Sequence, residues 1–177
     1  MNVKFSDGQL ETHTADIRRL IQTVDDEFVP PLTGGSRSDM DRSAAEGGHT
    51  DVDGYVNRCL ARPLIYAVED DRVVGFLSFK QISESKFLDG YTPSNHVEIV
   101  AVEPDSRGQG IASTLYEYLF TDLPTEWVQP YVTTKTWDDN EAHIAILEQF
   151  GFDLVHRIPN DRGADTDTVY FARETAP

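Results

Sequence analysis

Apolar residues near the start of the chain recur at intervals of three and four, which is the spacing of one face of an α-helix. The residues that carry this pattern are Ile17, Leu20, Ile21, Val24 and Phe28. A helix is therefore predicted there, with Thr14 or Asp16 as its start signal. A second short helix is predicted over 52–61, because the residue before Pro63 disfavours helical backbone.

Continuous apolar runs in the middle of the chain predict strands instead. Runs over 64–68 and 73–79 flank the polar segment 69–72, an arrangement typical of a β-hairpin. A third, largely buried strand is predicted over 97–102, directly before Glu103 and Pro104. The later patterns predict helices over 108–122 and 138–150, and strands over 127–134, 152–158 and 168–172.

The predicted helix over 138–150 has signals at both ends. Asp138 and Glu141 have the spacing of a capping box, and Gly151 follows as a stop signal. With a short strand at the N-terminus, the predicted order of elements is βααβββαβαββ. This order predicts a mixed α/β fold.

The chain has the length of one ordinary domain. Its 177 residues can bury a single core without disulfide bonds, so we expect one domain over 1–177. The segment 33–50 is rich in Gly and Ser and has no apolar period, which predicts a mobile loop within that domain. Loops of this length inside a compact domain are uncommon and often functional.

The composition is strongly acidic. Asp and Glu together number 31 against 15 Lys and Arg, which gives a formal net charge of −16. Such a chain repels polyanions, which argues against nucleic acid and against an anionic membrane surface as partners. Only 4 of the basic residues are Lys, and acidic excess with few Lys resembles proteins of salt-loving organisms. We therefore expect a halophilic protein, because molar salt screens self-repulsion.

Other features bear on location and metals. Cys59 is the single cysteine, so no intramolecular disulfide can form, which fits a reducing cytoplasm. No run approaches the roughly 18 apolar residues of a membrane span, and the first residues lack the apolar core of a signal peptide. The histidines are widely spaced and no cysteine pair occurs, so no metal site is expected. We expect a cytoplasmic protein.

The segment 100–112 carries the most distinctive chemistry. It leads from an apolar strand through Arg107, Gly108 and Gly110 into a predicted helix. The glycines let a bulky ligand approach the backbone, and a helix start offers unpaired N–H groups and the positive end of its dipole. Together they predict an anion site suited to a pyrophosphate, with Arg107 as an added charged donor.

Three kinds of anion-binding loop compete for this segment. A triphosphate-binding loop requires Gly-Lys-Ser/Thr at the helix start, and no Lys lies here. A dinucleotide fingerprint requires a third glycine where this chain has Ser113, and a position directly after the strand. The third kind fits best. Arg107-x-x-Gly110-x-Ala112, after a strand that ends Ala-Val-x-Pro, closely resembles the acyl-CoA pyrophosphate loop of the GNAT superfamily of N-acyltransferases.

A second stretch at the expected distance strengthens the resemblance. Asn140 and the residues 146–152 look like the later family helix that starts with Asn and ends in Gly-Phe. The element order also matches from about Val3 to Ala172. The resemblance implies a single-domain GNAT-like fold, in which a central mixed, largely antiparallel sheet splays at the cofactor cleft and is flanked by about four helices.

The resemblance also implies a site for acetyl-CoA. The strand that pairs with the pantetheine arm would be Val100, Ala101 and Val102. The residues that would hold the pyrophosphate are Arg107, Gly108, Gln109, Gly110, Ile111 and Ala112. Asn140 would contact the pantetheine side of the cofactor.

The implied reaction is direct transfer of an acetyl group from acetyl-CoA to a primary amine. A base must first remove a proton from the ammonium. His96 and Glu98 are both candidates, since they lie two apart on the predicted strand and so share one face. A strand amide near Val100 would stabilise the developing oxyanion.

One position departs from the family pattern. Leu147 stands where the family often has the Tyr that protonates the departing thiolate, and nothing singles out Tyr91 or Tyr131 as its substitute. The departure leaves a second hypothesis open, a CoA-binding sensor or regulatory module without turnover. The acceptor would be an amine-bearing small molecule or peptide, bound in this family by the first helices, their loop and the last strands. The acidic surface favours a cationic amine, and we expect a monomer or homodimer.

Overall fold

The computed structural model describes residues 1–33 and 51–175. Its strands are β1 (Asn2–Ser6), β2 (Leu64–Glu69), β3 (Arg72–Ile82), β4 (Ser94–Val102), β5 (Tyr131–Trp137), β6 (Asp153–Ile158) and β7 (Thr168–Glu174). Its helices are α1 (Thr14–Val24), α2 (Val52–Leu60), α3 (Ile111–Thr121) and α4 (Glu141–Gln149), with short 3-10 turns at Asp25–Glu27, Pro104–Ser106 and Thr125–Trp127. Apart from Thr33, the loop predicted over 33–50 lies outside the described residues.

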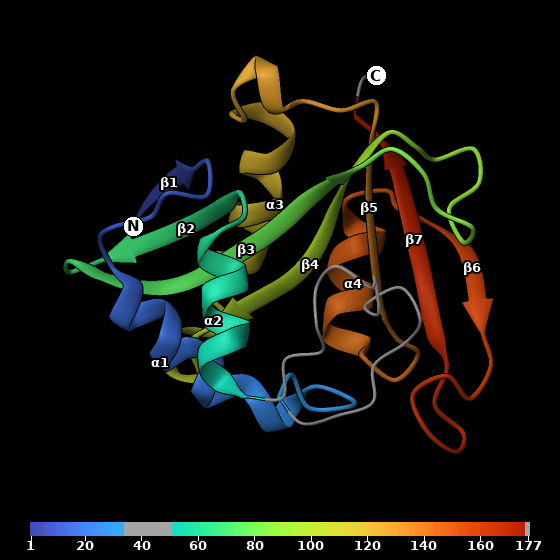
Figure 1. Cartoon of the computed structure of the whole chain (residues 1–177), viewed down its shortest axis with the longest axis horizontal. Coiled ribbons are helices and arrows are strands. Elements are labelled where there is room, and N and C mark those ends of the chain that lie inside the picture. Colours follow the sequence, from blue (N-terminus) through green and yellow to red (C-terminus); the bar gives the residue numbers. More distant parts are fainter. Residues whose placement is uncertain (34–50, 176–177) are drawn as a thin grey trace.

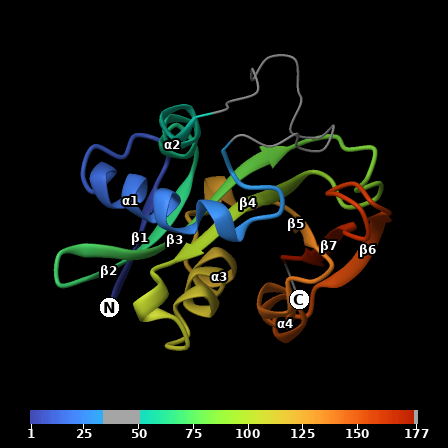
Figure 2. The same cartoon turned by 90° about the horizontal axis from the view of Figure 1, so that it is seen from below.

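The order of strands and helices is the predicted βααβββαβαββ. The described strands form one sheet in the order β1-β2-β3-β4-β5-β7-β6, in which the only parallel neighbours are β4 and β5. The twisted sheet runs through the middle of the molecule (Figure 1). Figure 2 shows α1 and α2 on one face of it and α3 and α4 on the other. The predicted mixed α/β fold, with a largely antiparallel sheet and four helices in the described residues, is confirmed.

A hydrophobic core fills the space on each side of the sheet. The periodic residues of α1 are fully buried, and Ile17 and Leu20 pack in one cluster with Phe76 of β3. On the opposite face, Leu115 of α3 belongs to a second cluster with Leu77 of β3. Burial of each such side chain contributes about 2 kcal/mol. The two cores hold both helix layers in place against β3 and β4.

The sheet opens between β4 and β5. These parallel strands pair only over Ser94–Val97 with Tyr131–Thr134. Beyond that point β4 stays paired with β3, and β5 stays paired with β7. The rest of β4 and β5 therefore part from one another inside the sheet, as the predicted splay requires.

The structure corrects two predicted boundaries. The helix expected from 108 begins at Ile111, because Gly108 and Gly110 adopt φ values of +75° and +78°, which no α-helix accommodates. The strand expected from 127 begins at Tyr131, because Trp127 ends a 3-10 turn and Pro130 comes between them. Propensity alone shows neither of these local backbone conformations.

A third correction concerns the start of α4. The predicted capping residue was Asp138, but the N-cap is Asn140, whose side chain accepts from the His143 N–H. The Asp138 carboxylate instead accepts a hydrogen bond of 3.0 Å from the Asp167 N–H, next to β7. It therefore joins the start of α4 to the last strand rather than capping the helix.

Candidate functional site

A cleft of about 510 Å³ lies where β4 and β5 part. One side of it is formed by α2 and the end of α1, and the other by the turn before α3 and the first turns of α4. Both predicted catalytic residues, His96 and Glu98, line it. So do nine predicted cofactor residues: Val100, Ala101, Val102, Arg107, Gly108, Gly110, Ile111, Ala112 and Asn140. Among the predicted residues, Gln109 alone is not part of the lining.

The turn before α3 presents backbone donors to this cleft. Gly110 is the N-cap residue and supplies no side-chain cap. The first helical bond runs from the Thr114 N–H to the Gly110 carbonyl oxygen at 2.9 Å, so the N–H groups of 111–113 have no helical partner. A Cβ atom added to Gly108 or Gly110 would meet no atom within 4 Å. The turn therefore fits an anion held by exposed amides and the positive helix end.

Arg107, the predicted cationic partner of the anion, lies at the rim of the cleft. Its Nε donates to the Val102 carbonyl oxygen at 3.3 Å, and its guanidinium donates to the Glu27 carboxylate at 2.7 Å. The Arg107 and Glu27 side chains are 45% and 47% exposed, and ion pairs this exposed contribute about 0–1 kcal/mol. An anion at the turn can therefore draw Arg107 away from Glu27 at little cost.

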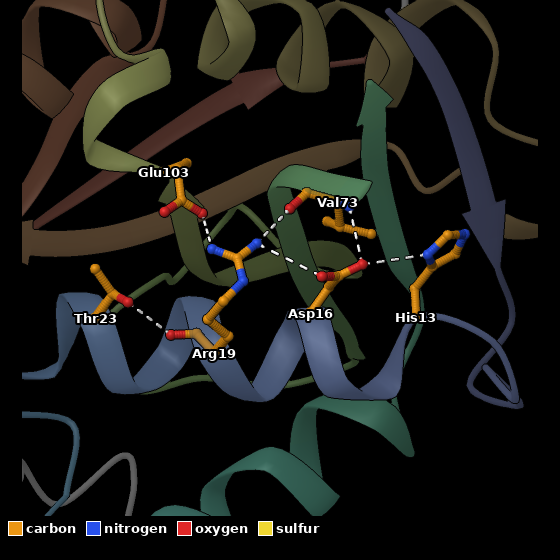
Figure 3. Close-up of polar contacts among 6 residues, drawn as sticks. All are labelled: His13, Asp16, Arg19, Thr23, Val73 and Glu103. Carbon is orange, nitrogen blue, oxygen red and sulfur yellow. Dashed lines mark hydrogen bonds and ion pairs between the residues drawn. The ribbon is translucent and has the colours of Figure 1, made fainter. Parts of the chain in front are cut away.

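A polar network holds the chain just before this turn (Figure 3). The Arg19 guanidinium of α1 pairs with Glu103, the residue after β4, and donates to the Val73 carbonyl oxygen at 3.0 Å. The Asp16 carboxylate accepts from the Val73 N–H at 3.1 Å and lies 3.6 Å from Arg19. It also lies 3.3 Å from Nδ1 of His13. The network ties α1 to the start of β3 and to the end of β4, from which the chain continues to the turn before α3.

Close packing of α3 against the sheet depends on Gly75 of β3. A Cβ atom at this position would lie 2.8 Å from Cγ2 of Ile111 and 3.2 Å from the Ala101 carbonyl oxygen. Ile111 is the first residue of α3 and is only 2% exposed. Gly75 therefore sets how closely the start of α3 approaches β4.

The backbone of β4 is irregular at Glu98. Its pairing with β3 skips one residue there, and its pairing with β5 ends at Val97. Val97 packs in the core beneath α3 and α4, whereas Ile99 packs in the core beneath α1 and α2. Strict alternation of side chains is therefore interrupted, and the shared face expected for His96 and Glu98 does not follow from strand geometry alone.

The two candidate bases have different surroundings. The Glu98 carboxylate is 16% exposed and pairs with Arg62, just after α2, and with Nζ of Lys80 at 3.0 Å. His96 is 1% exposed, and its Nδ1 lies 2.9 Å from Oγ1 of Thr133. Glu98 is thus a carboxylate between two cations at the opening of the sheet. His96 is a buried imidazole within the part where β4 and β5 still pair.

Asn140 lines the cleft, and its side chain is engaged at both ends. Its Oδ1 accepts from the His143 N–H at 3.4 Å, and its Nδ2 donates to Oγ1 of Thr136 at 2.9 Å. These bonds account for Asn140 as the cap of α4. Its contact with the cofactor stays a prediction.

A polar pair on the α3–α4 side of the cleft was not expected from the sequence. The Tyr116 hydroxyl lies 2.8 Å from Nε2 of His143. Burial raises the pKa of Tyr116 and lowers the pKa of His143 to about 4. His143 lines the cleft four residues before the buried Leu147, so the two share one side of α4. The spacing of His143 and Leu147 is the one sign of this position in the sequence. Tyr116 lies 27 residues before His143, and only the fold brings the two side chains together.

One face of α2 also contributes side chains that the motifs did not indicate. Tyr55, Arg58, Cys59 and Arg62 all line the cleft. They occupy positions i, i+3, i+4 and i+7, a spacing that places them on one side of a helix. The spacing is visible in the sequence, but its significance depends on where α2 lies over the sheet.

Two other kinds of site have no counterpart in the part of the chain that the structure describes. No three His, Cys, Asp or Glu residues there gather as a metal site would require. None of the helices in the same ranges has both the length and the apolar character to cross a membrane.

Comparison with known proteins agrees with the geometry of the cleft. The model of the acetyltransferase (GNAT) family matches residues 23–152, which include the splayed strands and the turn before α3. The match covers most of the chain, so this protein belongs to the GNAT acetyltransferase family. No curated protein sequence matches the chain.

Solved structures share the fold at low sequence identity. An aminoglycoside 6'-N-acetyltransferase complexed with coenzyme A is 17% identical, with a TM-score of 0.70 over 100% of this chain and 98% of that one. For an aminoglycoside 6'-acetyltransferase type Ii the identity is 19% and the TM-score 0.68, over 100% and 99% of the two chains. The yncA protein from Salmonella typhimurium, solved with acetyl-CoA, is 19% identical with a TM-score of 0.68, over 100% and 95%.

Proposed function

We propose that this protein transfers an acetyl group from acetyl-CoA to the primary amine of a small molecule or peptide. The observation that carries the proposal is the turn of exposed amides at Gly110 beside the opening of the sheet. Family membership supports acetyl transfer, and two of the similar structures contain CoA or acetyl-CoA. Acetyl-CoA supplies the acetyl group as an activated thioester.

The cleft fits such an elongated, anionic molecule. The amides at 110–112 would hold the pyrophosphate, with Arg107 exchanging Glu27 for a phosphate oxygen. On the side facing β5, the backbone of Val100 and Val102 has no strand partner. These groups would bond the amides of the pantetheine arm, since backbone donors and acceptors inside a protein require partners.

In this proposal Glu98 receives the proton of the attacking amine. It is the first residue of β4 beyond the last pair with β5, and it lies in the cleft that both helix layers enclose. Arg62 and Lys80 offset the cost of burying its charge. Proton transfer to Glu98 through one water molecule leaves a neutral amine that can attack the thioester. His96 is the competing candidate, because imidazole is the side chain best suited to exchange a proton near neutral pH.

The departing sulfur requires a hydrogen-bond donor, and Leu147 has none. His143 offers one from the same side of α4, because a neutral imidazole carries one N–H group. The Tyr116 hydroxyl at 2.8 Å holds the ring in place. In this proposal His143 takes the place of the missing family Tyr.

Thiol release with a panel of amines, together with the binding of CoA, tests the proposal. Gly110→Val places a β-branched residue at a φ of +78° and adds carbon atoms where the exposed amides of the turn would hold the pyrophosphate, so CoA affinity should fall at least tenfold. Gly90→Val is the matched control, because Gly90 has a φ of +82° in equally open space outside the cleft. Unchanged CoA affinity in Gly110→Val would overturn the assignment of the loop.

The base is tested by comparing Glu98→Gln with His96→Gln. Loss of a general base costs roughly 10²–10⁴-fold in rate. A loss of this size in Glu98→Gln, together with loss of the acid limb in the pH profile of the rate, supports Glu98 as the base. The same result in His96→Gln would assign the role to His96. Tight CoA binding without thiol release for any amine would favour the alternative, a CoA-binding regulatory module, which Leu147 in place of Tyr permits.

A further inference from the structure

The wall of the cleft away from α3 and α4 carries arginines. Arg58 of α2 and Arg62, just beyond its end, are four residues apart and line the cleft together with Tyr55. An acceptor that enters from the α2 side would meet these two side chains.

The charge of the cleft is opposite to that of the chain. The described residues that line it include five cationic side chains: Arg58, Arg62, Arg107, Lys135 and Arg162. They include two carboxylates, Glu27 and Glu98. Five positive charges against two negative ones give a formal charge of +3, in a chain whose net charge is −16. A cleft with charge of one sign concentrates ligands of the other sign. Arg107 is assigned above to the pyrophosphate of acetyl-CoA, so the cations considered for the acceptor are those on the α2 side of the cleft.

The two carboxylates already pair with two of these cations. Glu27 pairs with Arg107, and Glu98 pairs with Arg62. Arg58 differs, because no carboxylate within the described ranges pairs with it and its buried Nε has no hydrogen-bond partner there. Its guanidinium carbon lies 5.1 Å from the centre of the Tyr55 ring, a stacking contact that orients the group. Arg58 is therefore a positioned donor with unused capacity.

We propose that Arg58 binds an anionic group of the acceptor, so that the acceptor is a short primary amine that also carries a carboxylate or phosphonate. The inference rests on the proposed acetyl transfer and names its substrate class. Guanidinium and carboxylate form paired, charge-assisted hydrogen bonds. Glu98, which pairs with Arg62 just beyond the end of α2, would receive the ammonium end of the same molecule. Arg58 and Glu98 together thus match the two ends of a zwitterion.

The same arrangement disfavours a polycation. A polyamine or an aminoglycoside would bring several ammonium groups next to guanidinium groups, and like charges repel in a partly desolvated site. The acidity of the whole chain favours a cationic amine when it is considered by itself. The charges that meet the acceptor are local, however, and they reverse that expectation.

Matched acceptors test the inference: glycine, β-alanine and γ-aminobutyrate against their amides, with spermidine as a polycation. We expect kcat/KM for thiol release to be at least tenfold higher for the best carboxylate than for its amide, and lower still for spermidine. Arg58→Gln should remove this preference with a 10–100-fold rise in KM, and Arg58→Lys should restore part of it. The affinity of Arg58→Gln for CoA should stay within twofold of that of the unsubstituted protein. Arg72→Gln, which removes an exposed arginine of the β2–β3 hairpin, should change nothing.

The outcomes separate this inference from the proposed function. If the amides or spermidine are acetylated as well as the carboxylates and Arg58→Gln is normal, the inference is overturned while acetyl transfer stands. A tenfold loss of CoA affinity in Arg58→Gln also overturns it, because Arg58 would then serve the cofactor. If no amine releases thiol, the proposed acetyl transfer fails. Calorimetry of the carboxylates with the CoA complex then tests the anion site by itself. Binding that Arg58→Gln abolishes supports the anion site, and absence of binding overturns it.

Discussion

The Tyr116 hydroxyl lies 2.8 Å from Nε2 of His143, and this contact joins the middle of α3 to the first turn of α4 beside the cleft. Burial holds both groups in their neutral forms, since it raises the pKa of Tyr116 and lowers the pKa of His143 to about 4. The pair therefore carries no charge at neutral pH, and its His143 lines the cleft.

Stability should fall in mild acid because of His143. Its pKa is near 6.5 when unfolded and about 4 when folded, so the unfolded chain binds the proton more readily between these values. The contribution is complete above pH 6.5 and is lost as the pH falls toward 4, and we expect it to be about 1–2 kcal/mol because His143 is only partly buried. Denaturant unfolding at pH 7 and 4.5 measures it. His143→Gln should flatten the difference, and an equally steep loss in that variant would contradict the assignment.

Gly75→Ala should loosen the start of α3. The added Cβ would lie 2.8 Å from Cγ2 of Ile111, so the helix start must move or the side chain must repack. Overpacking of this kind costs about 1–3 kcal/mol. We expect a lower free energy of unfolding together with weaker CoA binding, measured by denaturation and calorimetry. Gly151→Ala is a control for a loss of stability away from the cleft: a φ of +72° strains an alanine there, but the added Cβ meets no atom within 4 Å, so CoA affinity should not change. Normal CoA affinity in a destabilised Gly75→Ala protein would show that CoA binding by the turn before α3 does not depend on how closely α3 packs against the sheet.

Arg19→Met should destabilise the protein more than Arg18→Met. Arg19 is 29% exposed and separates the carboxylates of Glu103 and Asp16, whereas Arg18 is 43% exposed and pairs with Asp53, which is 69% exposed. We expect a loss of about 2 kcal/mol for Arg19→Met and under about 1 kcal/mol for Arg18→Met. Adding Glu103→Gln to Arg19→Met should recover part of the loss, because it removes a carboxylate left without its cation. Equal effects of the two arginine substitutions would argue against the network.

Thermal stability should rise with KCl. A net charge of −16 opposes compaction, and the Debye length shrinks from about 10 Å at 0.1 M to about 3 Å at 1 M. We therefore expect most of the increase in Tm between 0.1 and 1 M KCl, with a plateau above it. A rise that continues in proportion to concentration would indicate preferential exclusion of salt instead. A flat response would contradict the prediction of salt adaptation.

Apolar periodicity was sufficient to predict the order of the elements. Residues such as Ile17 and Leu20 are completely buried, so the need for apolar side chains at buried positions produces the periodic pattern. Three strands extend beyond their predicted ranges, to Ile82 in β3, from Ser94 in β4 and to Trp137 in β5. The starts of the two later helices depend on backbone conformations of single residues. Gly108 delays α3, and Asn140 rather than Asp138 caps α4. Propensity averaged over a window does not resolve such positions.

The candidate site was predictable only where it is continuous in the sequence. The turn before α3, which we propose binds the pyrophosphate, is one short segment whose donors are backbone amides, so the motif contains all of it. By contrast, Arg19 meets Glu103 across 84 positions and Tyr116 meets His143 across 27. The net charge likewise did not foretell the cationic wall that contains Arg58. Contacts between distant segments are properties of the fold, and a single sequence does not display them.

The short pairing of β4 with β5 makes the protein two plates joined along one edge. In the described chain, four residue pairs, Ser94–Val97 with Tyr131–Thr134, provide all the strand pairing between the plate β1–β4 and the plate β5–β7. Beyond this hinge, side-chain packing and a few side-chain hydrogen bonds, such as that between Tyr116 and His143, set the angle between the plates, and these contacts yield more easily than a hydrogen-bonded ladder. A molecule that bonds Gly110 on one plate and Asn140 on the other would lock that angle. Substrate binding would then stiffen the whole sheet and not only the residues that it touches.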